Sequence, residues 1–230
     1  MIWSYGVTTV PQRLGDLLPE TLSSLSRAGF GYPRLFVDGP PGSGRDDYEK
    51  FGLDITRRDQ RVRPFGNWLL ALTELYVREP NADRYAIFQD DLVASAGLRE
   101  YLEKTPYPSR GYLNLYTMPS NQDLVDRDFV GWFRSNQFGR GAVGLVFDRD
   151  AVLVLLTSQS FMFRIQDVER GWKSIDGAVV TAMVKAGYSE FVHSPSLVQH
   201  TGKESSMGTK PQPLAPSFRG ENFDLRELLK

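Results

Sequence analysis

Two adjacent carboxylates are the first residues of the sequence whose type and spacing could do chemistry. Asp90 and Asp91 follow the apolar run "YAIF" after a single glutamine. Such a run is typical of a buried strand in a parallel sheet, and open α/β sheets bind ligands beyond the carboxyl ends of their strands. Acids there suit Mg²⁺ or Mn²⁺, which one or two carboxylates hold while substrate phosphates complete the shell. The alternative is that the acids end the strand in solvent and that one of them caps the next helix.

Polar residues also stand where two earlier strands are predicted to end. Thr8, Thr9 and Arg13 stand at the end of the first strand, and the guanidinium group of Arg13 could pair with a phosphate or contact a base edge. The alternative for Arg13 is a surface arginine that opens a helix. Asp38 ends the second strand, where a carboxylate could accept a hydrogen bond from a ribose hydroxyl or a pyrimidine N–H group. It could equally start a turn with the glycine that follows it.

Two residues at predicted helix starts complete the polar set. Asn67 opens a helix and could reach a nucleotide, whereas the neighbouring Trp68 favours the core. Asp176 directly precedes a helix that begins at Gly177, and the free N–H groups and the dipole at a helix start stabilise a carboxylate. Asp176 is therefore the candidate general base that accepts the proton of a hydroxyl, and its alternative is an ordinary N-cap. Trp172 stands just before it and could stack on a sugar or a base.

Strands and helices alternate along the 230 residues, and this alternation positions the polar residues. The pattern predicts an α/β fold with a mostly parallel central sheet flanked by helices. From residue 201 the pattern dissolves, so residues 1–208 are expected to form a single domain, and residues 209–230 a C-terminal extension behind a mobile loop, with a last short helix at "DLRELLK". Strands are expected at residues 2–9, 34–38, 85–89, 111–117, 142–148 and 188–193, and helices at 16–29, 67–77, 98–104, 150–158 and 177–187.

The composition argues against several classes of site and partner. A net charge of −1 gives no support for a general electrostatic hold on nucleic acid, although Arg57, Arg58, Arg61 and Arg63 form one local cluster. The absence of cysteine excludes disulfides and thiolate metal sites. The N-terminus has no basic leader, and no apolar run is long enough to cross a bilayer. We therefore expect a cytoplasmic protein without a membrane span.

Seven segments of the chain stand in a recognisable order: "TTVPQR", "LFVDG", "GNWLLAL", "QDD", "GRGAVGLVFDRD", "WKSIDGAVVTAMVKAG" and "SPSLVQHTGKESSMG". In this order and spacing they resemble the nucleotide-sugar glycosyltransferases with the GT-A fold, a Rossmann-like α/β fold. The resemblance extends over roughly residues 3–208, and the order of the segments rather than any one motif carries it.

The resemblance implies a metal site at "QDD", where the family has an Asp-x-Asp or Glu-Asp-Asp motif. Gln89 departs from that pattern, so Asp91, helped by Asp90 through a water, would hold Mn²⁺ or Mg²⁺. The family often takes a third ligand from a late histidine, which implies His200, since neutral imidazole binds Mn²⁺; the alternative is a structural histidine. Lys203 could neutralise the leaving diphosphate and close over the donor, or it could be a solvated loop lysine.

The resemblance implies a glycosyltransferase that moves a sugar from a nucleoside-diphosphate sugar, preferably a UDP-sugar, to an acceptor hydroxyl. Asp176 would deprotonate the acceptor and one displacement would invert the anomeric centre, whereas a merely capping Asp176 leaves a retaining mechanism open. The alternatives are a nucleotidyltransferase and a non-catalytic nucleotide- or sugar-binding module. A nucleotidyltransferase usually carries a glycine-rich loop with a basic residue straight after the first strand, and the segment "TTVPQRLG" matches that pattern poorly. The acceptor stays open between a glycan, a lipid, a protein side chain, a small metabolite and a hydroxylated DNA base, which the net charge does not favour.

Overall fold

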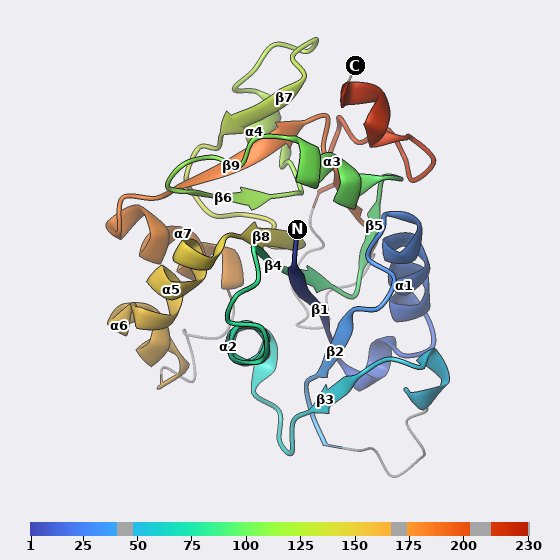
Figure 1. Cartoon of the computed structure of the whole chain (residues 1–230), viewed down its shortest axis with the longest axis vertical. Helices are drawn as coiled ribbons and strands as arrows, with labels where there is room; N and C mark the ends of the chain where they lie inside the picture. The colour runs from blue at the N-terminus through green and yellow to red at the C-terminus, as the bar shows by residue number, and fades with distance from the viewer. Residues whose placement is uncertain (41–47, 167–173, 203–212, 230) are drawn as a thin grey trace.

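The structure, a computed structural model of the chain, describes residues 1–40, 48–166, 174–202 and 213–229. Its centre is an eight-stranded mixed sheet in the order β3-β2-β1-β4-β8-β6-β9-β7, with helices on both faces (Figure 1). The predicted α/β fold with a flanked central sheet is therefore confirmed. In the described residues, no helix is both long and apolar enough to span a membrane.

The first half of the sheet is parallel, as the alternation of strands and helices predicts. β1 pairs with β2 and β4, and β2 pairs with β3, all in parallel. The helix α2 begins four residues before the predicted start, because a proline in its first turn fits the helix geometry. The elements are β1 (Trp3–Thr9), η1 (Pro11–Arg13), α1 (Leu17–Arg27), β2 (Arg34–Val37), η2 (Glu49–Phe51), β3 (Ile55–Arg57), α2 (Arg63–Arg78) and β4 (Arg84–Gln89).

The second half of the sheet is mixed. β8 runs antiparallel to both β4 and β6, β6 pairs in parallel with β9, and β7 pairs antiparallel with β9 at the edge. β4, β6 and β9 therefore point the same way, and their carboxyl ends share one edge of the sheet. The elements are α3 (Leu98–Lys104), β6 (Gly111–Asn114), α4 (Pro119–Gln122), β7 (Gly131–Arg134), β8 (Gly144–Phe147), α5 (Arg149–Thr157), α6 (Gln159–Met162), η3 (Phe163–Gln166), α7 (Ile175–Lys185) and β9 (Ser189–Ser194).

A second, two-stranded sheet pairs β5 (Leu92–Ala94) antiparallel with β10 (Val198–His200). The C-terminal residues pack beside it and end in the 3-10 helix η4 (Leu225–Leu229). Leu225 is fully buried, and its N–H group donates to the carbonyl of Ala96. The division of the chain at residue 208 stays a prediction, although Ala215 and Leu225 both belong to the hydrophobic core.

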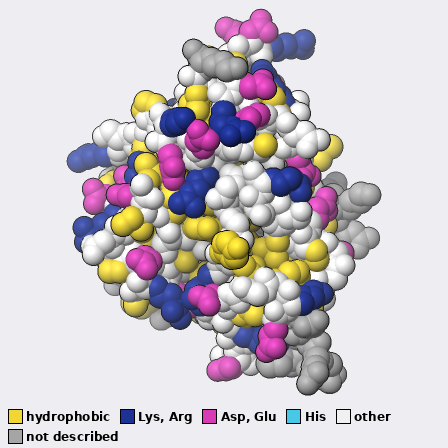
Figure 2. Space-filling view, turned by 45° about the vertical axis from the view of Figure 1, so that its right-hand side comes forward, with side chains coloured by type: hydrophobic (Ala, Val, Ile, Leu, Met, Phe, Trp, Pro, Cys, Tyr) yellow, Lys and Arg dark blue, Asp and Glu magenta, His cyan; other side chains and the backbone are white. Residues whose placement is uncertain are grey.

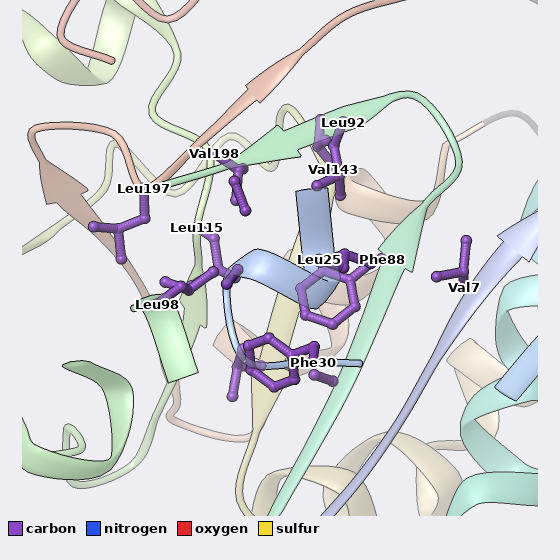
Figure 3. Close-up of a cluster of buried hydrophobic side chains, with 14 of the residues drawn as sticks. Val7, Leu25, Phe30, Phe88, Leu92, Leu98, Leu115, Val143, Leu197 and Val198 are labelled. Atoms are coloured by element: carbon purple, nitrogen blue, oxygen red, sulfur yellow. The ribbon is translucent and has the colours of Figure 1, made fainter. Parts of the chain in front are cut away.

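Two hydrophobic clusters fill the two faces of the sheet. One joins the strands to α1 and α3, and Figure 3 shows its members Leu25, Phe30, Phe88, Leu92 and Val198. The other lies under α2, α5 and α7 and contains large aromatic side chains, namely Phe65, Trp68, Tyr85, Tyr112, Phe147 and Phe161. The prediction that Trp68 belongs to the core is confirmed. Buried apolar neighbours on the first face, Leu92, Val143 and Val198, hold in place the chain segments that carry the candidate site.

Candidate functional site

The acidic pair forms a tight connection between two strands. β4 ends at Gln89, and β5 begins at Leu92, so Asp90 and Asp91 are the whole link between them. Both residues are buried, being 8% and 7% exposed, which contradicts the alternative of a strand end in open solvent. Thr9 at the end of β1 donates its hydroxyl hydrogen to Oδ2 of Asp90 at 2.6 Å. Burial, together with the neighbouring charge of Asp91, raises the pKa of Asp90 to about 7.

Arg13 points into the molecule and faces this pair. Its side chain is only 9% exposed, and its Nη1 atom lies 3.4 Å from Oδ2 of Asp91. The structure therefore excludes the alternative of a surface arginine. Opposite charges at this distance in a buried setting stabilise each other. Thr8 is half-buried and donates its hydroxyl hydrogen to the carbonyl of Phe88 at 3.3 Å, so it joins the carboxyl ends of β1 and β4.

The pairing of β10 with β5 brings a histidine to the acids. His200 lies opposite Leu92 in this pair, and its Nε2 atom is 3.1 Å from Oδ2 of Asp91, across 109 positions of sequence. The N–H group of Thr201 donates to the carbonyl of Asp91 at 2.8 Å and fixes the next turn. The structure thus places His200 beside Asp91, and the role of both residues as metal ligands stays a prediction.

The atoms around Asp91 fit a divalent cation. In the described part of the chain, Oδ1 of Asp91 and the hydroxyl oxygen of Thr201 are buried without a hydrogen-bond partner. Two ligand atoms that bind a small six-coordinate cation at right angles are about 3 Å apart. This is close to the 3.1 Å between Oδ2 of Asp91 and Nε2 of His200. A Cβ atom at Gly202 would come within 2.9 Å of Oδ2 of Asp91 and of Cε1 of His200, so the glycine leaves this space open.

The described residues hold no group of three or more His, Cys, Asp or Glu that could bind a metal by themselves. Asp91 and His200 would therefore supply two ligands, and substrate oxygens and water would supply the others. This division is the usual one for Mg²⁺, which keeps several waters and is held by one or two carboxylates and by substrate phosphates.

Asp38 and Asn67 are buried and already have partners in the protein. Oδ1 of Asp38 accepts a hydrogen bond from the N–H group of Val62 at 2.7 Å. The amide of Asn67 donates to the carbonyl of Phe36 at 2.8 Å and accepts from Nε of Arg58 at 3.0 Å. These contacts fix the carboxyl end of β2 against the start of α2. Contact of either residue with a nucleotide stays a prediction.

Asp176 lies in the first turn of α7, which begins at Ile175, two residues before the predicted start. The N-cap is Ser174, so the alternative in which Asp176 is the cap is wrong. Oδ1 of Asp176 accepts hydrogen bonds from the Ser174 hydroxyl and from the N–H group of Gly177, both at 2.9 Å. Oδ2 accepts from the N–H group of Gly141 at 2.7 Å. The carboxylate therefore ties the helix start to a distant loop.

This loop connects Asp176 to the acidic pair. The side-chain amide of Gln89 donates to the carbonyl of Ala142 at 2.7 Å, and the N–H group of Gln89 donates to the carbonyl of Val143 at 2.8 Å. Residues 141–143 thus run from Asp176 to the residue just before Asp90, at the carboxyl edge of the sheet. Sequence reasoning noted Gln89 only as a missing acid, but its amide supplies a donor that an acid would lack. Lys203 and Trp172 lie outside the described residues.

No family model and no curated protein matches the chain. Solved structures match at low sequence identity. A crystal structure of GalNAc-T7 with UDP, GalNAc and Mn²⁺ matches with a TM-score of 0.56 and 9% identity over 86% of this chain and 44% of that one. S. aureus TarS matches with a TM-score of 0.53 and 10% identity over 84% of this chain and 35% of that one. A nucleotidyl transferase from Methanothermobacter reaches a TM-score of 0.46 at 14% identity, over 85% of this chain and 88% of that one.

The first two likenesses show that the fold is GT-A-like. At identities near a tenth they show the fold alone, because folds of this kind host many activities. The chain spans less than half the length of these two proteins. Function must therefore be argued from the site.

Proposed function

We propose that the protein is a metal-dependent glycosyltransferase, which moves a sugar from a nucleoside-diphosphate sugar, preferably a UDP-sugar, to an acceptor hydroxyl. The observation that carries the proposal is the approach of His200 to Asp91 at 3.1 Å, beside a buried carboxylate oxygen that has no partner among the described residues. This is the edge at which α/β sheets bind ligands. The fold shared with a structure that holds UDP, GalNAc and Mn²⁺ supports the same class of donor.

Asp91 and His200 would hold Mn²⁺ or Mg²⁺, which when bound neutralises the charge of the leaving diphosphate. Arg13 lies beside Asp91 and would bind a phosphate oxygen as well. Thr9 fixes the carboxyl group of Asp90 next to the proposed metal ligand Asp91. The nucleoside is proposed to lie toward Asp38 and Asn67, along the same edge, and Lys203 stays proposed as a residue that closes over the diphosphate.

Asp176 is the proposed base. The acceptor oxygen forms a bond to the anomeric carbon of the donor, while the bond from this carbon to the diphosphate oxygen breaks and the diphosphate keeps the electron pair. The proton of the acceptor hydroxyl passes to Asp176. One displacement of this kind inverts the anomeric centre. The hydrogen bonds from Gly141, Ser174 and Gly177 hold the carboxylate in one orientation for this step.

The surface charge favours acceptors other than nucleic acid. On the face shown in Figure 2, the basic and acidic side chains of the described residues are interspersed rather than gathered into a basic field. Arg58, a member of the arginine cluster noted in the sequence, is mostly buried and lies 3.8 Å from Glu74. A phosphate backbone needs a continuous row of basic contacts, so a hydroxylated DNA base is the least supported acceptor.

The test is metal-dependent binding of the donor nucleotide. UDP should raise the melting temperature more with Mn²⁺ than with EDTA, and Asp91→Asn and Gly202→Ala should both remove this difference. Asp126→Asn is the matched control, because it removes the charge of an exposed acid and should leave the difference intact. Equal stabilisation by UDP with and without metal would contradict the proposal.

A nucleotidyltransferase is separated from this proposal by its products. Wild-type protein incubated with UDP-glucose and Mn²⁺ should release UDP slowly even when water is the acceptor. Incubation with UTP and glucose 1-phosphate should release no pyrophosphate. Release of pyrophosphate would favour the nucleotidyltransferase, and metal-dependent binding of UDP without any turnover would favour a binding module.

A further inference from the structure

The strand β10, which carries His200, is bonded to β5 on one side only. The N–H group of Thr201 donates to the carbonyl of Asp91 at 2.8 Å, so these two residues form a hydrogen-bonded pair. Bonded and unbonded pairs alternate along antiparallel strands. The next pair, His200 with Leu92, is therefore of the unbonded kind, and the N–H group of His200 points away from β5. Its partner must lie on the other side of the strand.

The side-chain amide of Gln199 is this partner. Its Oε1 atom accepts hydrogen bonds from the N–H group of His200 at 3.1 Å and from the N–H group of Ala215 at 2.9 Å. Its Nε2 atom donates to the carbonyl of Ala215 at 3.2 Å. The amide therefore pairs with both backbone groups of Ala215, as a neighbouring strand would, and it joins the end of β10 to the C-terminal segment.

The C-terminal segment around Ala215 is itself fixed to the domain. Ala215 is buried and belongs to the hydrophobic core. The hydroxyl oxygen of Ser217 accepts a hydrogen bond from the N–H group of Ser196 at 3.0 Å. The carbonyl of Pro213 accepts a hydrogen bond from the hydroxyl of Tyr116. This part of the chain is therefore a firm support against which the amide of the neighbouring strand can hold.

The position of His200 decides whether it can share a cation with Asp91. Val198 anchors the strand in the core, in the same cluster as Leu92 (Figure 3), but His200 is the last residue of β10. Beyond it, Gly202 leaves open the space beside both candidate ligand atoms. Metal ligands are oriented by partners one step further out, and loss of such a partner typically costs about 10- to 100-fold in metal affinity.

We propose, resting on the proposed function, that Gln199 is a positioning residue of the metal site. Its amide clamps β10 to Ala215 and so keeps His200 at the distance from Asp91 at which both bind one Mn²⁺ or Mg²⁺ ion. Gln199 acts through the backbone of His200 and supplies no ligand atom, because both polar atoms of its amide are bonded to backbone groups. In this arrangement the segment around Ala215 is part of the framework of the metal site rather than an extension beyond the domain.

The test uses the only two histidines of the chain as probes. NMR of the full chain, labelled with nitrogen-15 in its imidazole rings, gives one set of ring signals for each, and His200→Ala assigns them. Gln199→Met keeps the length of the side chain and removes the amide. Without metal, this variant should shift or broaden the His200 signals and leave those of the buried His193 in place. With UDP present, its dissociation constant for Mn²⁺, measured by EPR of the free ion, should rise by about tenfold, while UDP binding in EDTA stays unchanged.

Ser217→Ala is the matched control. It removes another hydrogen bond of the C-terminal segment, the one from the N–H group of Ser196, and leaves the amide of Gln199 in place. Its melting temperature should fall, as that of Gln199→Met should, because a buried N–H group loses its partner. Its His200 signals and its affinity for Mn²⁺ should match those of the wild type.

The outcomes separate the two proposals. Wild-type His200 signals and wild-type Mn²⁺ affinity in Gln199→Met overturn the positioning role and leave the metal site standing. Equal changes in Ser217→Ala and Gln199→Met overturn it as well, because a general loss of C-terminal packing then explains both. If the wild type binds no Mn²⁺ and the His200 signals move only in Gln199→Met, the positioning of His200 stands and the proposed metal dependence falls.

Discussion

Replacing Asp176 by Asn separates the chemical role of this carboxylate from its structural one. Asn can still accept the hydrogen bonds that Ser174 and Gly177 now make to Oδ1. Its NH₂ group cannot accept the hydrogen bond from the buried N–H group of Gly141, which now lies 2.7 Å from Oδ2. A hydrogen bond to a charged group contributes about 1.5–3 kcal/mol. For a protein of this size, in which 1 kcal/mol shifts the melting temperature by about 2–4 °C, the melting temperature should therefore fall by roughly 3–12 °C.

The catalytic effect should be much larger than this loss of stability explains. A positioned general base contributes typically about 10²- to 10⁴-fold, so we expect kcat for Asp176→Asn to fall by that factor, with UDP binding unchanged. Removal of a purely structural carboxylate would instead lower stability without a loss of kcat on this scale. Melting curves, titrations with UDP and measurements of kcat are the assays.

The matched control is Ser174→Ala, which removes the N-cap of the same helix and costs about 0.5–2 kcal/mol. It keeps the carboxylate, so its kcat should stay within a few-fold of the wild type. Two results would refute the reasoning. A kcat near that of the wild type in Asp176→Asn would reject the base and reopen the retaining mechanism, and an unchanged melting temperature would reject the structural role of the Gly141 hydrogen bond.

Two further predictions concern stability. Burial lowers the pKa of His193 to about 4, with the hydroxyl of Tyr101 hydrogen-bonded to Nε2 and Arg219 nearby. The pKa of histidine in the unfolded chain is about 6.5, so the unfolded chain binds the proton first as the pH falls. Stability is therefore lost as the pH falls from about 6.5 to about 4. Denaturant unfolding at pH 7 and pH 4.5 should show the wild type losing about 2–3 kcal/mol more than His193→Gln, and equal losses would contradict this. Leu225→Ala should lower the free energy of unfolding by about 2–5 kcal/mol, whereas the same substitution at the exposed Leu214 should change it by less than about 0.5 kcal/mol; similar effects at both positions would show that the C-terminal residues are no part of the core.

The sequence by itself determined the elements whose signals are local. Alternating apolar strands and amphipathic helices depend on side chains a few residues apart, so β1, α1, β2, α2 and β4 stand close to their predicted positions, whereas the short strand β3 was not predicted. The position of the acids after "YAIF" could likewise be predicted from local sequence. A strand that ends in polar residues places them at the ligand-binding edge of the sheet. The predicted metal pair followed from the order of the motifs, and the structure places Asp91 and His200 in contact.

Only the tertiary structure decided how these residues meet and which of them are already engaged. β5 and β10 are three residues long, too short for a periodic pattern, and only their pairing across more than a hundred positions puts His200 beside Asp91. The burial of Arg13 and the hydrogen bond from Gly141 to Asp176 depend likewise on segments that are far apart in the chain. Such contacts form only when the whole core closes, because the free energy that holds them comes from packing that no single segment contains.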